Sequence, residues 1–585
     1  MIFGKHVNKY YFKYWYLLLF GMLAVVAVDI AQLEIPNNYG YLIDYLETGT
    51  LTKELLFEIL LNILIVLGIL LIGRFLWRIC LLGVGIKVER DLRKEMFLHT
   101  TMLDQVFFQT NKTGAQMALY TNDIQNVRAC FDDGSIMIVD AVFLGIFAFV
   151  KMCTLNIVLA IISSIPLLLL ALCGGVIGKY MDKKWDERQK AFEDLSDFTQ
   201  ENFSGISVVK AFVKEGLELL SFTKINKENE EKNLSFVKFA TLLSIIINLL
   251  ISSILIIIIA YGGYLVRTFS SFSIGDLSRF IAYFNSLIWP MMAVGQLINL
   301  RAQGKASLKR IAEILDREPL VFDDESVIKN HEFKGSITFN HLNFTYPLAE
   351  NVVLKDMSFK INAGETVGII GKTGTGKTTI VDILTRIYNV SENTVLIDDI
   401  DIMKLPLHDV RNAISYVPQD NFLFGDTIIK NIGFSKVNIT EEEAKYYSEL
   451  AGVSEDIEGF KDGYYTVIGE RGVTLSGGQK QRISIARALA KNCKILILDD
   501  SVSAVDTKTE TTILSNLKKI KGDRTIILIA HRISTVMDAD KIILIDDGKV
   551  INVGTHNELL EKEPMYADIV HLQELEAMLV KEGDE

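Results

Sequence analysis

Cysteine is scarce in this sequence. The 585 residues contain five cysteines, and none has the spacing of a CxxC or a Cys/His metal site: Cys80, Cys130, Cys153, Cys173 and Cys493. We therefore expect reduced apolar thiols rather than a disulfide framework or a zinc site. The sequence also lacks a block rich in lysine and arginine, and its net charge is −12. This charge argues against a nucleic-acid partner.

Long apolar runs, by contrast, are abundant in the first half of the chain. Six runs approach the roughly 20 residues needed to cross a bilayer. They cover about 14–33, 55–78, 134–154, 157–178, 239–266 and 278–300. A signal peptide is the alternative for the first run, but that run is long, has no small-residue cleavage site and is followed by further spans. Residues 1–317 are therefore predicted to form an all-α transmembrane domain.

The connections between the runs predict the orientation of this domain in the membrane. Two long connections, about 79–133 and 179–238, are rich in lysine and arginine, whereas the loop at 34–54 is short and mostly acidic. The positive-inside rule then places both long connections and both termini in the cytoplasm of a multi-pass plasma (inner) membrane protein that contacts lipids. Each long connection contains a glycine-marked break, near Gly114 and Gly205. Such a break can present a short docking helix to a cytoplasmic partner.

Polar residues within the spans are candidates for an interior cavity, because facing lipid would be costly for them. They are Asp29 and Gln32 in the first span, and Asn285 and Gln296 in the sixth. Arg74 near the end of the second span could either contact substrate or extend to the lipid headgroups. The segment Trp289–Met292 would suit a permissive apolar binding surface. Ordinary helix packing is the alternative interpretation for each of them.

A different pattern begins after the last span, where short strand and helix signals alternate as in an α/β domain. GKTGTGKTT, at Gly371–Thr379, matches the GxxxxGK[ST] phosphate loop. It follows the apolar strand Thr366–Ile370 and opens a predicted helix over Thr378–Tyr388. Its glycines would let backbone amides surround a phosphate, Lys377 would reach the β- and γ-phosphates, and the Thr378 hydroxyl would bind Mg²⁺. The sequence therefore predicts binding of a nucleoside triphosphate.

A second motif, KILILDDSVSAVD, occupies Lys494–Asp506. Its four aliphatic residues predict a strand that is buried on both faces. Asp499 and Asp500 would emerge at the carboxyl end of this strand, where open α/β sheets bind their ligands. This pattern alone is weak evidence for a ligand-binding site, because many buried strands end in acidic loops. Directly upstream, however, lies LSGGQKQR, at Leu475–Arg482.

Together with Gln419 in YVPQD and His531 in AHRIS, these motifs resemble those of the ATP-binding cassette (ABC) transporter family. The resemblance covers nearly the whole chain. Six spans ahead of one cassette, and GERG at Gly469–Gly472, resemble a half-transporter of the ABC exporter group. The resemblance implies an all-α six-helix transmembrane domain fused, through a linker over 318–334, to an α/β P-loop nucleotide-binding domain over 335–585.

The resemblance also implies a role for each motif residue. Tyr346 would stack on the adenine of ATP, and the catalytic residues would be Asp500, His531 and Gln419. The other contacts to this chain's own ATP would come from Gly371, Thr373, Gly374, Thr375, Gly376, Lys377, Thr378, Thr379 and Gln419. Mg²⁺ would be bound by Thr378, Gln419 and Asp499. ATP on the opposite subunit would be contacted by Ser476, Gly477, Gly478 and Gln479. SAVD, at Ser503–Asp506, would cross the cassette interface, and the glycine-marked breaks would correspond to coupling helices.

One residue departs from the family pattern. The family has glutamate directly after the strand aspartate, where it orients the water that attacks the γ-phosphate, and this chain has Asp500. The carboxylate is retained on an arm that is one methylene shorter, and a misplacement of about 1 Å can cost on the order of 10²-fold in rate. We therefore expect a site that binds ATP well and hydrolyses it poorly. The intact LSGGQ would complete a competent site on a second half-transporter in a heterodimer. A working homodimer that tolerates Asp500 is the alternative.

The expected function is ATP-driven export of amphipathic drugs or toxic compounds by alternating access. A flippase for lipids or lipid-linked glycans is the second expectation, and it would require a strongly basic cavity, which the sequence does not locate. A peptide exporter is the third, although those that process their cargo carry an N-terminal protease domain. A regulatory ATPase without transport is the alternative from a different class, and the six spans argue against it.

Overall fold

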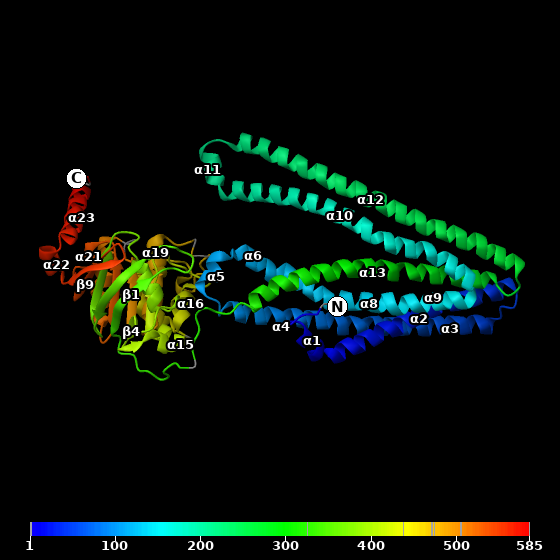
Figure 1. The fold of residues 1–585 in the computed structure, drawn as a ribbon, viewed down its shortest axis with the longest axis horizontal. Helices are drawn as coiled ribbons and strands as arrows, with labels where there is room; N and C mark the ends of the chain where they lie inside the picture. Colours follow the sequence, from blue (N-terminus) through cyan, green and yellow to red (C-terminus); the bar gives the residue numbers. More distant parts are fainter. Residues whose placement is uncertain are drawn as a thin grey trace. The chain divides into compact units, whose positions relative to one another are not determined.

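A computed structural model of the chain describes residues 3–324, 326–436, 438–469, 472, 474–502 and 506–583, with the backbone alone for 167–179, 182, 507 and 576–583. Two residues of GERG and three of SAVD lie outside the described residues. The chain divides into two compact units (Figure 1). The first comprises Met1–Thr101 and Thr113–Arg317, and the second comprises Met102–Lys112 and Glu318–Glu585.

The regular secondary structure described for the first unit is entirely helical. Its α-helices are α1 (Asn8–Lys13), α2 (Trp15–Glu47), α3 (Lys53–Trp77), α4 (Gly83–Thr100), α6 (Thr113–Ala118), α7 (Ile124–Phe131), α8 (Asp133–Val139), α9 (Gly145–Leu155), α10 (Ile157–Ser204), α11 (Ile206–Ala211), α12 (Glu215–Thr268) and α13 (Ile274–Leu315). Single π-helical turns join consecutive segments at η1 (Arg78–Leu82), η2 (Leu119–Asp123) and η3 (Asp140–Leu144).

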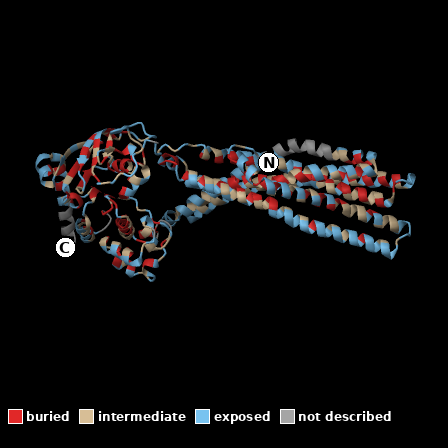
Figure 2. Ribbon diagram, turned by 90° about the horizontal axis from the view of Figure 1, so that it is seen from below, coloured by how far each residue is buried: buried red, intermediate tan, exposed pale blue. Residues whose placement is uncertain are grey.

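Five helical stretches among the described residues are long and apolar enough to cross a membrane: Trp15–Glu47, Lys53–Thr100, Thr113–Leu155, Glu215–Thr268 and Ile274–Leu315. These stretches contain five of the six predicted spans. The remaining predicted span, 157–178, falls on α10, where only Ile157–Pro166 is described as an apolar helix. The count of six therefore stays a prediction. In Figure 2 much of the ribbon along these helices is coloured as exposed, as expected of helices whose surface faces lipid.

The first loop is shorter than the sequence predicted. The predicted loop over 34–54 is wrong for most of its length, because α2 continues to Glu47 and α3 begins at Lys53. Ion pairs stabilise this extension of α2. The Lys151 ammonium lies 2.9 Å from the Glu34 carboxylate, and the Arg279 guanidinium lies 2.9 Å from that of Asp44. Glu34 and Asp44, which fall in the predicted loop, therefore form ion pairs with residues of other helices.

The second long connection has the predicted form. The helices α10 and α12 lie alongside each other, and the short helix α11 joins their ends (Figure 1). Aromatic pairs hold the two helices together, with ring centroids 5.6 Å apart for Trp185 and Phe236 and 4.6 Å apart for Tyr180 and Phe239. Helix α10 ends before Gly205, and α11 begins directly after it. The predicted break at this glycine is confirmed.

The second unit contains two sheets. A four-stranded antiparallel sheet has the order β2-β1-β4-β5, and a six-stranded sheet has the order β10-β9-β3-β8-β7-β6, in which only β10 is antiparallel. The strands are β1 (Ile337–Phe344), β2 (Leu354–Ile361), β3 (Thr366–Gly371), β4 (Val395–Ile397), β5 (Ile400–Asp401), β6 (Ile414–Val417), β7 (Ile495–Asp499), β8 (Thr525–Ala530), β9 (Lys541–Asp546) and β10 (Lys549–Gly554).

Helices surround these sheets. They are α5 (Gln105–Thr110), α14 (Lys377–Leu384), α15 (Leu407–Ala413), α16 (Ile428–Ile432), α17 (Glu441–Leu450), α18 (Ser454–Glu458), α19 (Gly477–Ala490), α20 (Thr507–Ile520), α21 (Ile533–Val536), α22 (His556–Lys562) and α23 (Pro564–Gly583), with 3₁₀ turns at Ile402–Lys404, Gly433–Ser435 and Gly463–Tyr465. The segment predicted as a linker contains no helix or strand among its described residues. Helix α14 ends four residues before the predicted Tyr388, since Arg386 adopts a left-handed backbone with φ of +50°.

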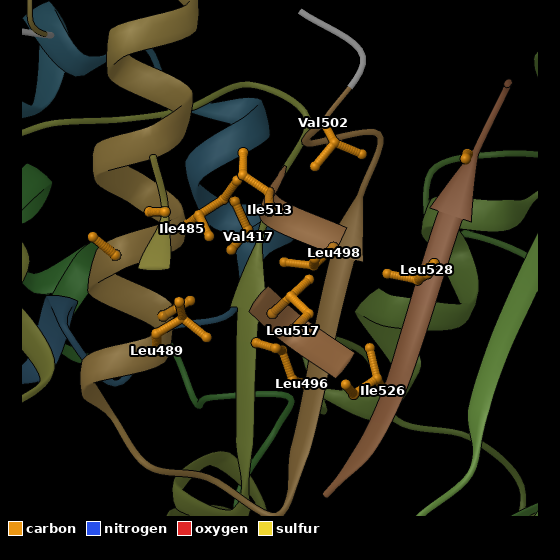
Figure 3. Packing of buried hydrophobic residues seen from close by; sticks show 14 of the residues in the cluster. Val417, Ile485, Leu489, Leu496, Leu498, Val502, Ile513, Leu517, Ile526 and Leu528 are labelled. Carbon is orange, nitrogen blue, oxygen red and sulfur yellow. The ribbon is translucent and has the colours of Figure 1, made fainter. Parts of the chain in front are cut away.

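The central strands of the six-stranded sheet, β3, β7, β8 and β9, are buried on both faces, as their continuous apolar runs predict, whereas the edge strand β10 is not. Side chains alternate along each strand, so Leu496 and Leu498 of β7 enter one core while Ile495 and Ile497 enter the other. Figure 3 shows the first of these cores, where Leu496 and Leu498 lie near Leu517 and near side chains of the neighbouring strands and helices. This packing fixes β7 and therefore the position of the two carboxylates at its end.

A short piece of the first long connection belongs to this second unit. Helix α5 is capped by Asp104, whose carboxylate accepts the Phe107 N–H at 3.1 Å. Val106 is buried in the core formed with β1 and β2, and the Gln109 amide donates to the Tyr388 hydroxyl at 3.2 Å. The helix lies before Gly114, the residue predicted to mark this break, and Gly114 itself lies inside α6. The cap, and not the glycine, defines the docking helix.

Candidate nucleotide-binding site

The glycine-rich loop connects β3 to α14 in the conformation that its glycines require. Gly374 and Gly376 have φ of +83° and +90°, a left-handed backbone that side chains with a Cβ rarely adopt. A Cβ on Gly371 would lie 2.2 Å from the Ile545 carbonyl oxygen. The predicted phosphate loop is therefore present, with a backbone that only glycine permits at these positions.

Lys377, the first residue of α14, folds over this loop. Its ammonium donates to the carbonyl oxygens of Gly371 and Lys372, at 2.8 Å each. Burial lowers the pKa of Lys377, and the nearby Asp499 and Asp500 carboxylates oppose this effect. The loop thus holds a buried cation beside two acids, an arrangement suited to binding the negative charge of a triphosphate.

Asp499 ends strand β7 and is buried. Burial raises the pKa of Asp499, while hydrogen bonds from the hydroxyls of Thr378 and Tyr416 oppose the rise. Thr378 and Asp499 thus offer neighbouring oxygen atoms of the kind that Mg²⁺ prefers. The described residues contain no group of three or more His, Cys, Asp or Glu side chains that could hold a metal ion by themselves. This donor set therefore fits a Mg²⁺ that arrives with the phosphates of a nucleotide.

Asp500 follows in a left-handed backbone, with φ of +47°. Its N–H donates to the Ile529 carbonyl at 2.7 Å, and its own carbonyl accepts the Gln481 amide at 3.1 Å. The Gln419 amide, on the loop after β6, donates to the Asp500 carboxylate at 3.3 Å. The structure thus brings together Gln419, Asp499, Asp500 and the phosphate loop, as predicted, and it anchors the Asp500 backbone from two sides.

Tyr346 is half-buried and contacts helix α14. Its hydroxyl is 2.9 Å from the Thr379 hydroxyl and donates to the Asp382 carboxylate at 3.3 Å. Its ring contacts that of Tyr388 edge-on, with centroids 5.1 Å apart. Burial raises the pKa of Tyr346 to about 12 and that of Asp382 to about 6. Tyr346 is thus packed against α14, and its stacking on adenine stays a prediction.

The LSGGQ segment forms the beginning of α19. The Ser476 hydroxyl accepts the Gln479 N–H at 3.3 Å, and the Gln479 side chain accepts the Ser476 N–H at 3.1 Å. This reciprocal capping box satisfies two backbone donors at the helix start. The Gln479 amide also donates to Asp456 at 3.1 Å. The LSGGQ residues, which we call the signature segment, therefore form a capped helix N-terminus, and such an N-terminus favours a negatively charged ligand.

One residue that supports His531 was not predicted from the sequence. Gln573 on α23 donates to the His531 carbonyl at 2.7 Å, and its side-chain oxygen accepts the Ile533 N–H at 2.8 Å. A single amide thereby holds the loop on both sides of Arg532. No local pattern marks Gln573, because the contact joins segments about 40 residues apart.

Replacing Gln573 by alanine should loosen this loop. The Ile533 N–H would lose its acceptor, so we expect its hydrogen exchange to accelerate by about tenfold, equivalent to one hydrogen bond of about 1.4 kcal/mol. Hydrogen-exchange mass spectrometry of the peptide that covers 531–533 measures this change. Gln573→Glu, which keeps an acceptor for Ile533, should restore most of the protection. Equal exchange in Gln573→Ala and the unmodified chain would contradict the assigned role.

The fold and this site define a class: a phosphate-loop ATPase domain fused to a helical membrane region. Residues 18–291 match the family described as ABC transporter transmembrane region, and residues 354–503 match the ABC transporter family. The chain therefore belongs to the ABC transporter family and is a multi-pass membrane protein.

Relatives match it over nearly their full length. The chain is 36% identical to the probable multidrug resistance ABC transporter ATP-binding/permease protein YheI of Bacillus subtilis (strain 168), over 98% of this chain and 97% of that protein. It is 33% identical to the multidrug resistance-like ATP-binding protein MdlA of Escherichia coli (strain K12), over 98% and 97%. Its fold is similar to that of a bacterial Atm1-family ABC exporter with ATP bound, with a TM-score of 0.75 and 24% sequence identity. The similarity covers 97% of this chain and 98% of that one.

Proposed function

We propose that this chain is one half of an ATP-driven exporter of amphipathic compounds in the plasma (inner) membrane, with both termini in the cytoplasm. Family membership and the multidrug-type relatives support ATP-driven export. In this proposal residues 1–317 move the substrate, residues 335–585 bind ATP, and residues 318–334 link them. ATP closes two cassettes around two nucleotides, and closure turns the membrane cavity outward because each ligand binds one conformation more tightly.

The single observation that supports unequal ATP hydrolysis at the two sites is the aspartate at position 500. Its carboxylate accepts a hydrogen bond from Gln419, its arm is one methylene shorter than that of glutamate, and its backbone is held by hydrogen bonds to Ile529 and Gln481. Phosphoryl transfer depends mainly on positioning, so the short arm should slow hydrolysis in this site. We propose that a second half-transporter, with a glutamate at this position, provides the competent site of a heterodimer.

The proposed roles in this chain's own site follow the geometry. Lys377 and the loop amides bind the phosphates, and the hydroxyl of Thr378 and the carboxylate of Asp499 hold the metal with help from Gln419. Mg²⁺, when bound with ATP, would neutralise charge on the β- and γ-phosphate oxygens. Ser476, Gly477, Gly478 and Gln479 would bind the γ-phosphate of ATP on the partner, at the capped N-terminus of α19.

The direct test is ATP-dependent uptake into inverted membrane vesicles that contain this chain with its genomic neighbour. Dyes, drugs and lipids serve as test compounds. We expect uptake of amphipathic compounds only when both chains are present, and loss of uptake when ATP is replaced by a non-hydrolysable analogue. ATP turnover without uptake of any compound would contradict export. Uptake restricted to lipids would favour a flippase.

A further inference from the structure

The helical unit contains a cavity of about 400 Å³ between α2, α3, α8, η3 and α13. Its polar lining includes Asp29, Gln32, Arg74, Asp140, Asn285, Ser286 and Trp289. The prediction that Asp29, Gln32 and Asn285 face an interior cavity is therefore confirmed, whereas Gln296 lies outside this lining. The cavity belongs to the membrane unit and shares no residue with the nucleotide-binding site.

Two buried carboxylates in this lining are held differently. The side chain of Asp140 accepts the Trp289 indole N–H at 2.7 Å. Asp29, only 4% exposed, has a buried oxygen, Oδ2, with no hydrogen-bond partner among the described residues. An ionised carboxylate in a buried place is costly unless a cation or hydrogen bonds compensate it. Asp29 is therefore a buried acceptor that faces the cavity without a partner.

The lining offers one positive group, and that group does not pair with Asp29. The exposed Arg74 guanidinium contacts the side-chain oxygen of Gln32 at 3.5 Å. The lining thus contains two carboxyl groups and one guanidinium, so its acidic side chains outnumber its basic ones. This balance is the opposite of the strongly basic cavity that a flippase for phosphate-bearing lipids would require.

The remaining lining suits an aromatic cation. Trp77 and Trp289 contribute indole rings, whose faces attract cations. The hydrogen bond to Asp140 fixes the indole of Trp289, so its ring is held in place before a ligand binds. Val25, Val28 and Leu144 supply apolar surface for the body of such a ligand.

We propose that this cavity binds a singly charged aromatic organic cation, with Asp29 as its counter-ion and the indoles of Trp77 and Trp289 against its rings. Anions of the same size and shape are rejected, because they would meet two carboxylates. That such a cation is also transported rests on the proposed export function. The binding itself does not.

The test compares two ions of matched shape and opposite charge, tetraphenylphosphonium and tetraphenylborate. Equilibrium dialysis measures their binding to the full chain, purified with its partner in lipid nanodiscs. We expect the phosphonium to bind more tightly than the borate. Asp29→Asn should weaken phosphonium binding by on the order of tenfold, as expected when a buried charge loses its partner, and leave borate binding equal or stronger.

The matched control is Glu34→Gln, on the same helix. Its carboxylate pairs with Lys151 at 2.9 Å and lines a different cavity, so this change should leave phosphonium binding unaltered. Asp29→Glu, which keeps the charge, should retain most of the phosphonium binding. Equal binding of the two ions by the unmodified protein would overturn the inference without any variant, as would unchanged phosphonium binding in Asp29→Asn.

Vesicle uptake separates this inference from the proposed function. Phosphonium binding that depends on Asp29, combined with no ATP-driven uptake of any compound, would support the cavity assignment and contradict export. Uptake of neutral, anionic and cationic compounds alike, with no effect of Asp29→Asn on phosphonium binding, would overturn the cavity assignment and support export.

Discussion

Lengthening Asp500 by one methylene, as Asp500→Glu, should raise the ATPase rate of this chain purified alone by on the order of 10²-fold. The longer arm would bring the carboxylate to the water that attacks the γ-phosphate. The backbone at this position has φ of +47°, which aspartate tolerates better than glutamate, so part of the gain will be offset by strain of about 1 kcal/mol. Steady-state phosphate release by the purified chain measures the effect.

Asp500→Asn is the matched control, since it keeps the length and the backbone preference of aspartate while removing the charge. It should leave ATP binding intact and turnover as low as, or lower than, that of the unmodified chain. Turnover of about 10 s⁻¹ by the unmodified chain alone, a typical enzyme rate, would remove the argument for a heterodimer. An unchanged rate in Asp500→Glu would show that the arm length does not limit hydrolysis.

Placing a carboxylate in the signature segment, as Gly477→Asp, should reduce the ATPase rate of the complex with the partner by on the order of 10²-fold. The new charge would repel the γ-phosphate at the N-terminus of α19, where loss of one stabilising group typically costs that much. The fold should tolerate it, because a Cβ on Gly477 meets no atom within 4 Å. An acid in the first turn of a helix is itself stabilising by about 0.3–1 kcal/mol.

Gly477→Ala adds the Cβ without the charge and should retain most of the activity. Lys377→Ala, which weakens ATP binding in this chain's own site, should reduce transport less than the equivalent change in the partner. Thermal unfolding of each variant shows whether the fold is intact. Full activity of the complex with Gly477→Asp would contradict the role of this segment in completing the partner's site.

The local parts of the nucleotide-binding site could be predicted from the sequence, and the parts made by distant contacts could not. The spacing of glycines around Lys377 specifies a strand, a loop and a helix, because few residues can adopt that backbone. The aliphatic run before Asp499 specifies a buried strand for a similar reason. Gln573 and Gln109 carry no such local signal, and their hydrogen bonds become evident only once the chain has folded.

The membrane unit shows the same limit. Apolar runs locate the spans, but they do not say where a helix ends beyond the apolar core. The sequence pattern assigns Glu34 and Asp44 to a loop, because their cationic partners lie more than 100 residues away along the chain. These partners are Lys151 and Arg279. Likewise, Asp104 caps the docking helix α5 that Gly114 was expected to mark. Polar residues paired across a fold are the ones that sequence patterns misplace.

Within the second unit, Tyr388 lies between Tyr346 and helix α5. The Tyr346 ring touches Tyr388, and the Tyr388 hydroxyl holds Gln109 of α5. If Tyr346 shifts when adenine stacks on it, only one side chain separates that movement from the helix that leads back into the membrane unit. Adenine occupancy could thus be relayed mechanically before any phosphate is cleaved, which would let binding and hydrolysis act as separate signals.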